Sequence, residues 1–326
     1  MNILFSSCGR RVELIRHFRE ALGRHGSGTL VGVDTNPLAP ALVEVDRKAI
    51  VPRCDSKEFL PVLKQICEKE GIDMLVPLID PELTVYSESI GLLNSIGTRV
   101  LVSCPETVET CLDKVLTARF LEDRNLPFLR TVPVSDGIPE SVIRLPAVLK
   151  PRCGSGGMDV FTVFEDEEIM SLSRRVHEPI LQEKAEGQEI TLDCLVDFNG
   201  KPLRVVARER LEIRAGESSK GRTVKDGYLT DLTEDLLMNL RACGPVTVQC
   251  FRSEGKYVFT EINPRFGGGY PLAHAAGAGF PDIIMSLAQG ESVEKDLSAY
   301  DEDVYFARFD EAFYLRRDGR NGYRQD

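Results

Sequence analysis

The chain has 326 residues, of which 42% are hydrophobic and 28% charged, and its 40 basic and 51 acidic side chains give a formal net charge of −11. This length is typical of about two domains, and the composition is that of a folded globular protein rather than a disordered chain. The acidic balance argues against a general binder of nucleic acid or of anionic membranes, since both partners are polyanions.

The sequence also shows no targeting pattern and no zinc-binding pattern. No apolar run approaches the roughly 18 residues that a membrane span needs, and the short apolar N-terminus precedes its arginines, unlike a signal peptide. The nine cysteines include no Cys-x-x-Cys pair, and the four histidines lack the spacing of zinc ligands. We therefore expect reduced cysteines and a cytoplasmic protein that binds neither membrane nor nucleic acid.

The first third of the chain alternates short apolar runs with helical patterns. Runs typical of buried strands lie at residues 2–5, 29–33, 49–51, 73–78 and 100–102. Apolar residues at helical spacing predict helices over residues 12–22 and 59–70. This alternation predicts a mostly parallel sheet with helices on both faces, which we expect to form an α/β domain over residues 1–111.

The turn after the first predicted strand has features of a nucleotide-binding loop. Gly9 follows that strand and Asp34 follows the second, but no further glycine occurs before Gly23, so the Gly-x-Gly-x-x-Gly pattern is missing. A nicotinamide-dependent oxidoreductase is therefore a minor alternative. Arg10 and Arg11 stand where a helix N-terminus would favour an anion, although solvated surface charges are the commoner case.

A predicted helix from Asp113-Lys114 to about Arg124 opens the second part of the chain. A strand over residues 148–150 then leads Lys150 into a glycine-rich loop at residues 151–158. The amides of such a loop can fold over phosphate oxygens, and the lysine supplies a point charge. Gly-Lys-Ser/Thr does not follow, so the loop is not a Walker A motif, and by itself it could be a simple turn.

The next segments favour antiparallel pairing. A strand that begins at Ile180 breaks at Gly187, and strands over 191–197 and 201–209 flank an Asn-Gly turn. This part is therefore α+β rather than α/β. Residues 208–227 carry many charges and three glycines, which predict a mobile loop, either a solvated tip or a cover over an active site.

Residues 246–251 and 257–263 predict a hairpin that carries three oxygen ligands. The expected register pairs Phe251 with Phe259, Val248 with Ile262, and Gln249 with Glu261. Because side chains alternate along a strand, Glu261 and Asn263 share one face, where Gln249 joins them. Three hard oxygen donors suit Mg²⁺ that completes its shell with water and phosphate, although Glu261 and Asn263 could instead be exposed strand residues.

Taken in order, these motifs resemble the ATP-grasp superfamily. They are Lys114, Lys150 with its glycine loop, the segment Gln-Glu-Lys-Ala-Glu-Gly-Gln-Glu at 182–189, Gln249, and Glu261-Ile-Asn263-Pro-Arg265. The nearest likeness is one nucleotide-binding half of a carbamoyl-phosphate synthetase large subunit; biotin carboxylase and D-alanine–D-alanine ligase share the architecture. The resemblance implies that a pre-ATP-grasp domain precedes an ATP-grasp fold with antiparallel sheets.

The resemblance also implies domain limits. The ATP-grasp domain would span residues 112–290, with a lid subdomain over about 115–182. A polar C-terminal extension would follow over residues 291–326, and the segment 316–326 is expected to be disordered.

The family resemblance implies a role for each matching residue. Contacts to ATP are implied for Lys114, Lys150, Gly154, Ser155, Gly156 and Gly157 at the phosphates, for Glu183, Lys184 and Ala185 at the adenine, and for Glu189 at the ribose. The metal ligands would be Gln249, Glu261 and Asn263. Lys150 and Arg265 would be catalytic, with Arg265 steadying the transferred phosphoryl group or the acyl phosphate. An anionic acceptor would suit the cations Arg208, Arg210, Arg214 and Lys220.

The implied activity is that of a ligase dependent on ATP and Mg²⁺, with Mn²⁺ as a substitute. It would join a small-molecule carboxylate to an amine or thiol through an acyl phosphate, releasing ADP, and no cysteine would act as a covalent nucleophile. One alternative is a protein like the carbamoyl-phosphate synthetase large subunit that phosphorylates bicarbonate or carbamate, although the chain has room for only one grasp half. Another is a non-catalytic ATP-binding module. The resemblance to this superfamily also leads us to expect a homodimer.

Overall fold

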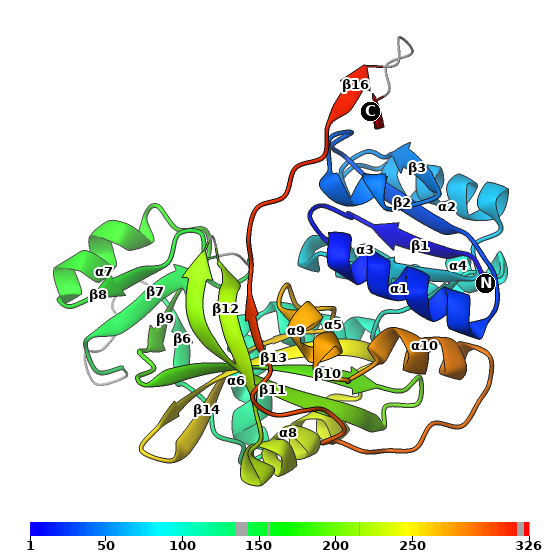
Figure 1. Cartoon of the computed structure of the whole chain (residues 1–326). Helices are drawn as coiled ribbons and strands as arrows, with labels where there is room; N and C mark the ends of the chain where they lie inside the picture. Colours follow the sequence, from blue (N-terminus) through cyan, green and yellow to red (C-terminus); the bar gives the residue numbers. More distant parts are fainter. Residues whose placement is uncertain (135–142, 155–156, 215, 318–322, 326) are drawn as a thin grey trace.

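The computed structural model describes the whole chain except residues 135–142, 155–156, 215, 318–322 and 326. Within the described residues, a layered α/β unit at the N-terminus lies beside a larger body built on antiparallel sheets (Figure 1). The expected combination of a parallel-sheet domain with antiparallel sheets is therefore confirmed.

The N-terminal sheet has five parallel strands in the order β3-β2-β1-β4-β5. They are β1 Ile3–Ser6, β2 Leu30–Asp34, β3 Arg47–Ile50, β4 Met74–Pro77 and β5 Arg99–Val100. All five overlap the runs predicted from the sequence, because central parallel strands are covered on both faces and need continuous apolar residues. The strand order reverses between β1 and β4, where α/β sheets commonly bind ligands.

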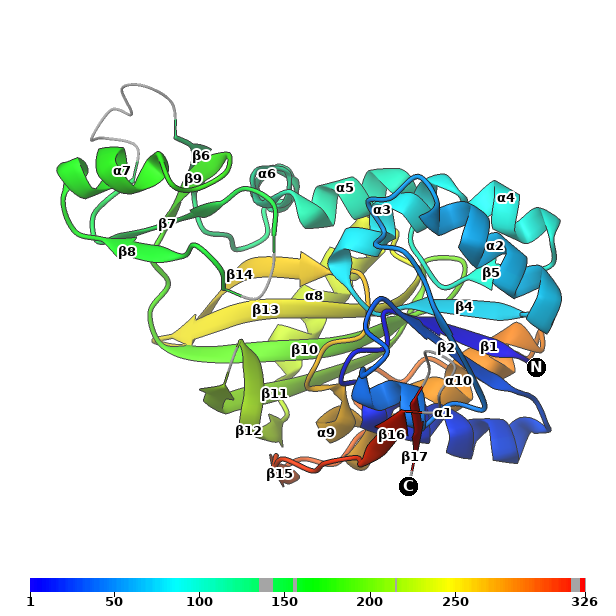
Figure 2. The same ribbon diagram turned by 90° about the horizontal axis from the view of Figure 1, so that it is seen from above.

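Helices cover both faces of this sheet (Figure 2). One face carries α1 Val12–His25 with the short 3₁₀ helix η1 Pro40–Val43, and the other carries α2 Phe59–Glu70, α3 Asp80–Glu88, α4 Ile90–Ser95 and α5 Pro105–Leu112. The helices predicted at 12–22 and 59–70 are confirmed. The sequence did not predict α3, whose buried residues include the polar Asp80, Glu82 and Ser87 and so lack an apolar stripe.

The central sheet has six strands in the order β14-β13-β10-β11-β12-β15, and all its pairings are antiparallel. Its strands are β10 Gln188–Val196, β11 Pro202–Arg214, β12 Glu217–Val224, β13 Gly244–Ser253, β14 Lys256–Asn263 and β15 Tyr305–Ala307. Helix α8 Gly227–Leu240 packs on one face through its leucines, together with the end of helix α6 Lys114–Asp123.

The expectation of a mobile loop over residues 208–227 is wrong. Strand β11 continues to Arg214, β12 returns over Glu217–Val224, and α8 begins at Gly227, although residue 215 lies outside the described part. Charged side chains pair across this hairpin; Lys220 Nζ, for example, lies 2.7 Å from Glu212 Oε2. Cross-strand ion pairs stabilise a hairpin without the apolar alternation by which strands are found in a sequence.

A smaller sheet forms the lid, here defined as β6–β9 with α7. Its strand order is β6-β9-β7-β8, and a separate apolar core lies between the sheet and its helix. The elements are β6 Thr131–Pro133, β7 Ala147–Pro151, β8 Phe161–Val163, α7 Asp166–Ser173 and β9 Pro179–Glu183. In Figure 1 the lid projects from the central sheet, on the side away from α1.

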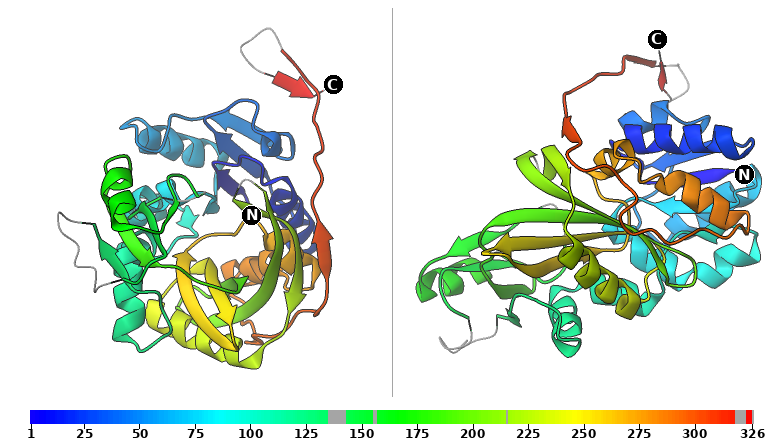
Figure 3. Two further views of the ribbon diagram at one scale, coloured as in Figure 1. Left: turned by 90° about the vertical axis from the view of Figure 1, so that its left-hand side faces the viewer. Right: turned by 60° about the horizontal axis from the view of Figure 1, so that its bottom comes forward.

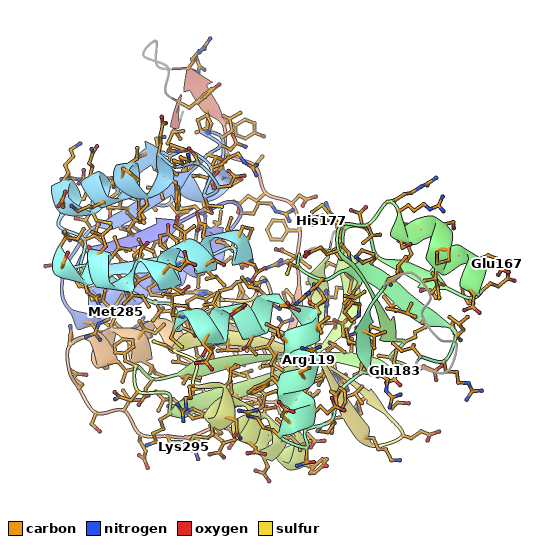
Figure 4. All side chains as sticks on the ribbon, turned by 180° about the vertical axis from the view of Figure 1, so that it is seen from behind. Arg119, Glu167, His177, Glu183, Met285 and Lys295 are labelled. Atoms are coloured by element: carbon orange, nitrogen blue, oxygen red, sulfur yellow. The ribbon has the colours of Figure 1, made fainter. Side chains whose placement is uncertain are left out.

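The C-terminal part of the chain returns to the N-terminal domain. Helices α9 Tyr270–Ala275 and α10 Phe280–Ala288 share an apolar core with α1, and Figure 4 shows Met285 of α10 beneath that domain. The chain then runs along one side of the molecule (Figure 3), adding β15 to the central sheet on its way. Disorder was expected over residues 316–326, but the described residues at the end form a small hairpin, β16 Leu315–Arg317 and β17 Tyr323–Gln325.

No helix among the described residues has the length and apolar character needed to cross a membrane.

The contact between α1 and α9 should make stability depend on pH. The rings of His17 and His274 stack with centroids 3.7 Å apart, and His17 Nδ1 has no hydrogen-bond partner among the described residues. Burial, together with His274, lowers the pKa of His17 to about 4, from the usual 6.5 of a histidine side chain. The unfolded chain therefore binds a proton more readily, and we expect the free energy of unfolding to fall as the pH drops from 6.5 toward 4.

Urea denaturation at pH 7.5 and pH 5 measures this loss. The variant His17→Phe keeps a stacked ring but cannot titrate, so its midpoint should change less between the two pH values than that of the wild type. The exposed His177→Gln is the matched control and should follow the wild type. Equal pH dependence in His17→Phe and the wild type would contradict this prediction.

Candidate functional site

The three predicted metal ligands lie together at the β13–β14 hairpin. Gln249 pairs directly with Glu261, and both line one cavity with Asn263. A β-bulge after Gln249 shifts the rest of the register, so Phe259 lies opposite Cys250 and the predicted pairing with Phe251 is wrong. A bulge accommodates an extra residue in one strand, and no apolar pattern announces it.

The two predicted phosphate-binding lysines approach this hairpin from two elements, Lys150 from the lid and Lys114 from the start of α6. Lys150, at the end of β7, is buried, and its Nζ lies 3.6 Å from Glu261 Oε1. Burial lowers the pKa of Lys150, and the Glu261 carboxylate opposes that shift. Lys114, the first residue of α6, donates from Nζ to the Gly154 carbonyl at 2.9 Å. Both cations therefore flank the start of the glycine-rich loop.

Asp113 positions the start of α6 beside that loop. Its carboxylate accepts hydrogen bonds from the amides of Val115 and Leu116, which caps the helix, and also from Arg152 Nε at 2.7 Å. One residue thus joins the helix that carries Lys114 to the strand end that carries the loop. Ser155 and Gly156 of the predicted loop site lie outside the described residues.

Two adjoining cavities surround these groups. The first cavity is lined by Lys114, Gly154, Asp80, Glu261 and Asn263 among others, and has about 330 Å³ of space partly open to solvent. The central cavity shares Asp80, Glu261 and Asn263 with it and extends to Arg208, Arg210 and Arg265, with about 870 Å³ of space partly open to solvent. A ligand that spans both would meet cations at each end and the oxygen donors between them.

Arg265 connects the site to the N-terminal domain. Its Nη2 donates to Asp80 Oδ2 at 2.8 Å, and Asp80 begins α3 directly after β4. The other carboxylate oxygen, Asp80 Oδ1, is buried and has no partner among the described residues. No motif in the sequence marks Asp80, although its place after a buried parallel strand is where α/β sheets carry functional groups.

Arg208 is held by a buried carboxylate. Its Nε donates to Asp193 Oδ2 at 2.7 Å, its Nη1 donates to Ser218 Oγ at 3.1 Å, and only 3% of Arg208 is exposed. The glycines that follow Arg265 make room for this pair. A Cβ on Gly269 would lie 2.4 Å from the Arg208 guanidinium, and one on Gly267 would lie 2.8 Å from Asp193 Oδ1.

The other residues predicted to bind the anionic acceptor substrate fall into two groups. Arg210 lines the central cavity and forms an ion pair with Glu189. Glu189, for which the resemblance implied a contact to the ribose, thus holds a cation of the central cavity. Arg214 and Lys220 pair with Asp310 and Glu212 near the exposed end of the hairpin. Neither belongs to the lining of the two cavities.

The predicted adenine contacts lie at the end of strand β9. Figure 4 shows Glu183 on the lid, on the side toward helix α6. Its Oε2 accepts a hydrogen bond of 2.9 Å from the Arg130 amide. Lys184 lies over the ring of Phe164, with Nζ 5.9 Å from the ring centroid, and Ala185 follows it.

The donor set at the hairpin fits a magnesium ion shared with phosphate. Only one of the three predicted ligands is a carboxylate, and no group of three or more His, Cys, Asp or Glu side chains gathers as a metal site in the described part of the chain. Mg²⁺ commonly takes few protein oxygens and completes its shell with water and substrate phosphates. Gln249, Glu261 and Asn263 would hold it beside the two lysines.

Three arginines converge on Glu217, a residue that the sequence analysis left unassigned. Arg308 Nη1 lies 2.8 Å, Arg11 Nη1 3.5 Å and Arg10 Nη2 3.9 Å from the Glu217 carboxylate; we call these three the arginine cluster. Burial alone would raise the pKa of Glu217, but Arg11 and Arg308 hold it below its usual value. Burial also lowers the pKa of Arg11 to about 10.

Comparison with known families identifies both halves of the chain. Residues 3–101 match the family model of the PylC-like N-terminal domain, and residues 159–311 match the model described as ATP-grasp in the biosynthetic pathway with Ter operon. The chain is thus similar to a PylC-like N-terminal domain over residues 3–101 and to an ATP-grasp domain over residues 159–311. The resemblance to the ATP-grasp superfamily is confirmed, and the matches support an ATP-dependent ligase.

The curated relatives are large chains of carbamoyl phosphate synthase. The one from Thermoplasma acidophilum is 24% identical over 277 residues, which is 77% of this chain and 26% of that protein. The arginine-specific mitochondrial one from Neurospora crassa is 25% identical over 224 residues, or 60% of this chain and 19% of that protein. The chain therefore spans about a quarter or less of the length of these relatives.

Solved structures share the fold at low sequence identity. Biotin carboxylase from Campylobacter jejuni superposes with a TM-score of 0.74 at 14% identity, covering 93% of this chain and 74% of that one. N5-carboxyaminoimidazole synthetase from Staphylococcus aureus, complexed with ADP, gives 0.72 at 15% identity over 90% and 78% of the two chains. L-amino acid ligase from Bacillus licheniformis gives 0.69 at 17% identity over 88% and 74%.

Proposed function

We propose that the protein is a ligase that uses Mg-ATP to activate a small-molecule carboxylate as an acyl phosphate and then transfers the acyl group to an amine, releasing ADP and phosphate. A thiol would be an alternative nucleophile. The observation that carries this proposal is the gathering of Gln249, Glu261 and Asn263 between Lys150 and Lys114 on one side and Arg208 and Arg265 on the other.

The charges around the two cavities suit the first half-reaction. Transfer of the γ-phosphoryl group to a carboxylate joins anions, so positioned cations are needed on both reactants. Lys114 lines the first cavity and Lys150 lies beside Glu261, so these two lysines would bind the phosphates, while Arg265, across the shared oxygen ligands, would hold the acid. A bound Mg²⁺, or Mn²⁺ in its place, would neutralise charge on the transferred phosphoryl group.

Two buried polar atoms without hydrogen-bond partners belong to residues that line the central cavity, which supports a polar, anionic acid as the substrate. Thr191 Oγ1 and Arg210 Nε are buried without hydrogen-bond partners among the described residues, and both residues line this cavity. Buried donors without partners are costly unless a ligand or water satisfies them. Carboxylate oxygens would accept hydrogen bonds from both groups.

The test is ADP formation from Mg-ATP in the presence of hydroxylamine. A panel of bicarbonate and small carboxylic acids, including amino acids, is offered one at a time, and the hydroxamate that forms from an acyl phosphate is measured. We expect one acid to stimulate ADP and yield its hydroxamate. Release of AMP with the acid, or an acid-stimulated ADP signal that never yields hydroxamate, would contradict the acyl-phosphate route.

Two alternatives predict different outcomes in the same assay. Stimulation by bicarbonate alone would favour the activity named for the curated relatives, carbamoyl phosphate synthesis. ATP binding without turnover for any acid would favour a non-catalytic module. The size exclusion profile of the same preparation tests the proposed homodimer.

A further inference from the structure

A third cavity, here called the side cavity, adjoins the central one. It lies between the turn that follows β1, the Gly267–Gly268 segment and the C-terminal chain, and encloses about 620 Å³ of space partly open to solvent. The two cavities share Arg11, Ile79, Glu217, Gly267 and Gly268 in their linings. A molecule in the side cavity would therefore lie next to a group bound in the central cavity.

The side cavity is lined by charges of both signs. All three members of the arginine cluster line it, and so do the carboxylates Glu13 and Glu217. These residues sum to one excess positive charge, which matches a single carboxylate better than a phosphate dianion. The two acidic groups can meanwhile accept hydrogen bonds from an ammonium group.

The arginine cluster comes from segments far apart in the chain. Arg10 and Arg11 lie in the turn before α1, whereas Arg308 directly follows β15 and also donates to the Gly268 carbonyl. A Cβ on Gly268 would lie 2.8 Å from Arg11 Nη1 and from the Glu217 carboxylate, so glycine leaves the space that this ion pair occupies beside both cavities. The β12–β15 pairing holds Arg308 in place, which gives the C-terminal extension a role at the site.

From this geometry we infer that the side cavity binds the attacking amine, and that this amine belongs to an amino acid whose carboxylate is held by the arginine cluster. This inference rests on the proposed function, because it names the nucleophile of the same reaction. A guanidinium binds a carboxylate through two parallel hydrogen bonds, which fixes the orientation of the amino acid. Glu217 and Glu13 accept hydrogen bonds from the amino group.

The reaction balances with these groups. The amine nitrogen forms a bond to the acyl carbon, and the bond between that carbon and the phosphate oxygen breaks. The acyl phosphate and a protonated amine thus give an amide, hydrogen phosphate and one proton released to solvent. The arginine cluster takes no part in bond making and acts on the position of the nucleophile.

The experiment compares amino acids with the corresponding amines that lack the carboxylate, such as glycine with methylamine and alanine with ethylamine. The acid is the one identified by the hydroxamate assay. We expect the wild type to prefer one amino acid over its amine. In Arg308→Ala, the KM for that amino acid should rise roughly 10- to 100-fold, as expected for loss of charged hydrogen bonds, while hydroxamate formation stays unchanged.

Two further variants separate binding from folding. Arg10→Ala removes a mostly exposed member of the cluster and should weaken discrimination between amino acid and amine even if Arg308→Ala folds poorly. Arg222→Ala is the matched control, because Arg222 also pairs with the C-terminal segment, at Asp303, but does not line the side cavity. It should keep the wild-type preference.

The outcomes distinguish this inference from the proposed function. Normal hydroxamate formation with equal use of amino acids and simple amines would overturn the amino-acid assignment alone. The amino-acid assignment would also be overturned if Arg308→Ala and Arg10→Ala both kept the wild-type preference for the amino acid over its amine. If no acid yields hydroxamate, the proposed function fails and the inference fails with it.

Discussion

Replacing Glu261 with glutamine should reduce ADP formation by about 10³-fold or more, equivalent to roughly 4 kcal/mol of transition-state stabilisation. Glu261 is the only carboxylate among the three proposed metal ligands, and it is also the partner of Lys150. The variant loses the anionic ligand and leaves a buried lysine without its counter-charge. Glutamine keeps the shape of the side chain, so the fold should be retained.

The measurement is the dependence of ADP formation on Mg²⁺ concentration, with thermal unfolding as the check on folding. Glu261→Gln should need more Mg²⁺ and still not regain the wild-type rate. Glu254→Gln is the matched control, since this exposed residue lies at the turn of the same hairpin. Near-normal activity in Glu261→Gln with an unchanged Mg²⁺ requirement would refute the proposed metal site.

Replacing Arg208 with alanine should lower the free energy of unfolding by about 3–5 kcal/mol and abolish ligase activity. The cost in stability arises because Asp193, which is 2% exposed, would keep a buried charge without its partner. The loss of activity arises because the guanidinium lines the central cavity. Urea denaturation measures the first effect, and acid-dependent ADP release measures the second.

A double variant separates these two effects. Arg208→Met with Asp193→Leu replaces the buried ion pair by apolar groups of similar size, which often restores stability. We expect it to fold nearly as stably as the wild type and to remain inactive. Arg214→Ala breaks an exposed ion pair at the end of the same strand and should change stability by less than about 1 kcal/mol. An active double variant would show that Arg208 has only a structural role.

The sequence predicted elements well wherever one local pattern dominated. The five parallel strands and helices α1 and α2 follow continuous apolar runs or apolar residues at helical spacing, which depend on neighbouring residues only. The pairing of Gln249 with Glu261 was predicted correctly, but the pairs between it and the turn were not, because a bulge between Gln249 and Cys250 shifts the register there. An extra residue in one strand leaves no apolar pattern in the sequence, so the bulge was missed.

Residues of the site were recognised when they belonged to a compact motif. Glu261, Asn263 and Arg265 lie within five residues, so their order could be compared with a family. Asp80, Glu217 and Arg308 come from α3, β12 and the C-terminal segment, and no spacing relates them. Only the folded chain brings Arg308 to Glu217 and Asp80 to Arg265.

By itself, then, the sequence determined the five parallel strands, helices α1 and α2, the ATP-grasp resemblance and the placement of Gln249, Glu261 and Asn263 on one hairpin. The tertiary structure alone decided that charged residues 208–224 form a hairpin and that Asp193 binds Arg208. It also decided that the arginine cluster meets Glu217 at the side cavity. The physical reason is the range of the interactions. Backbone preference and apolar periodicity act over a few residues, whereas ion pairs and cavity walls form between segments that only the complete fold brings together.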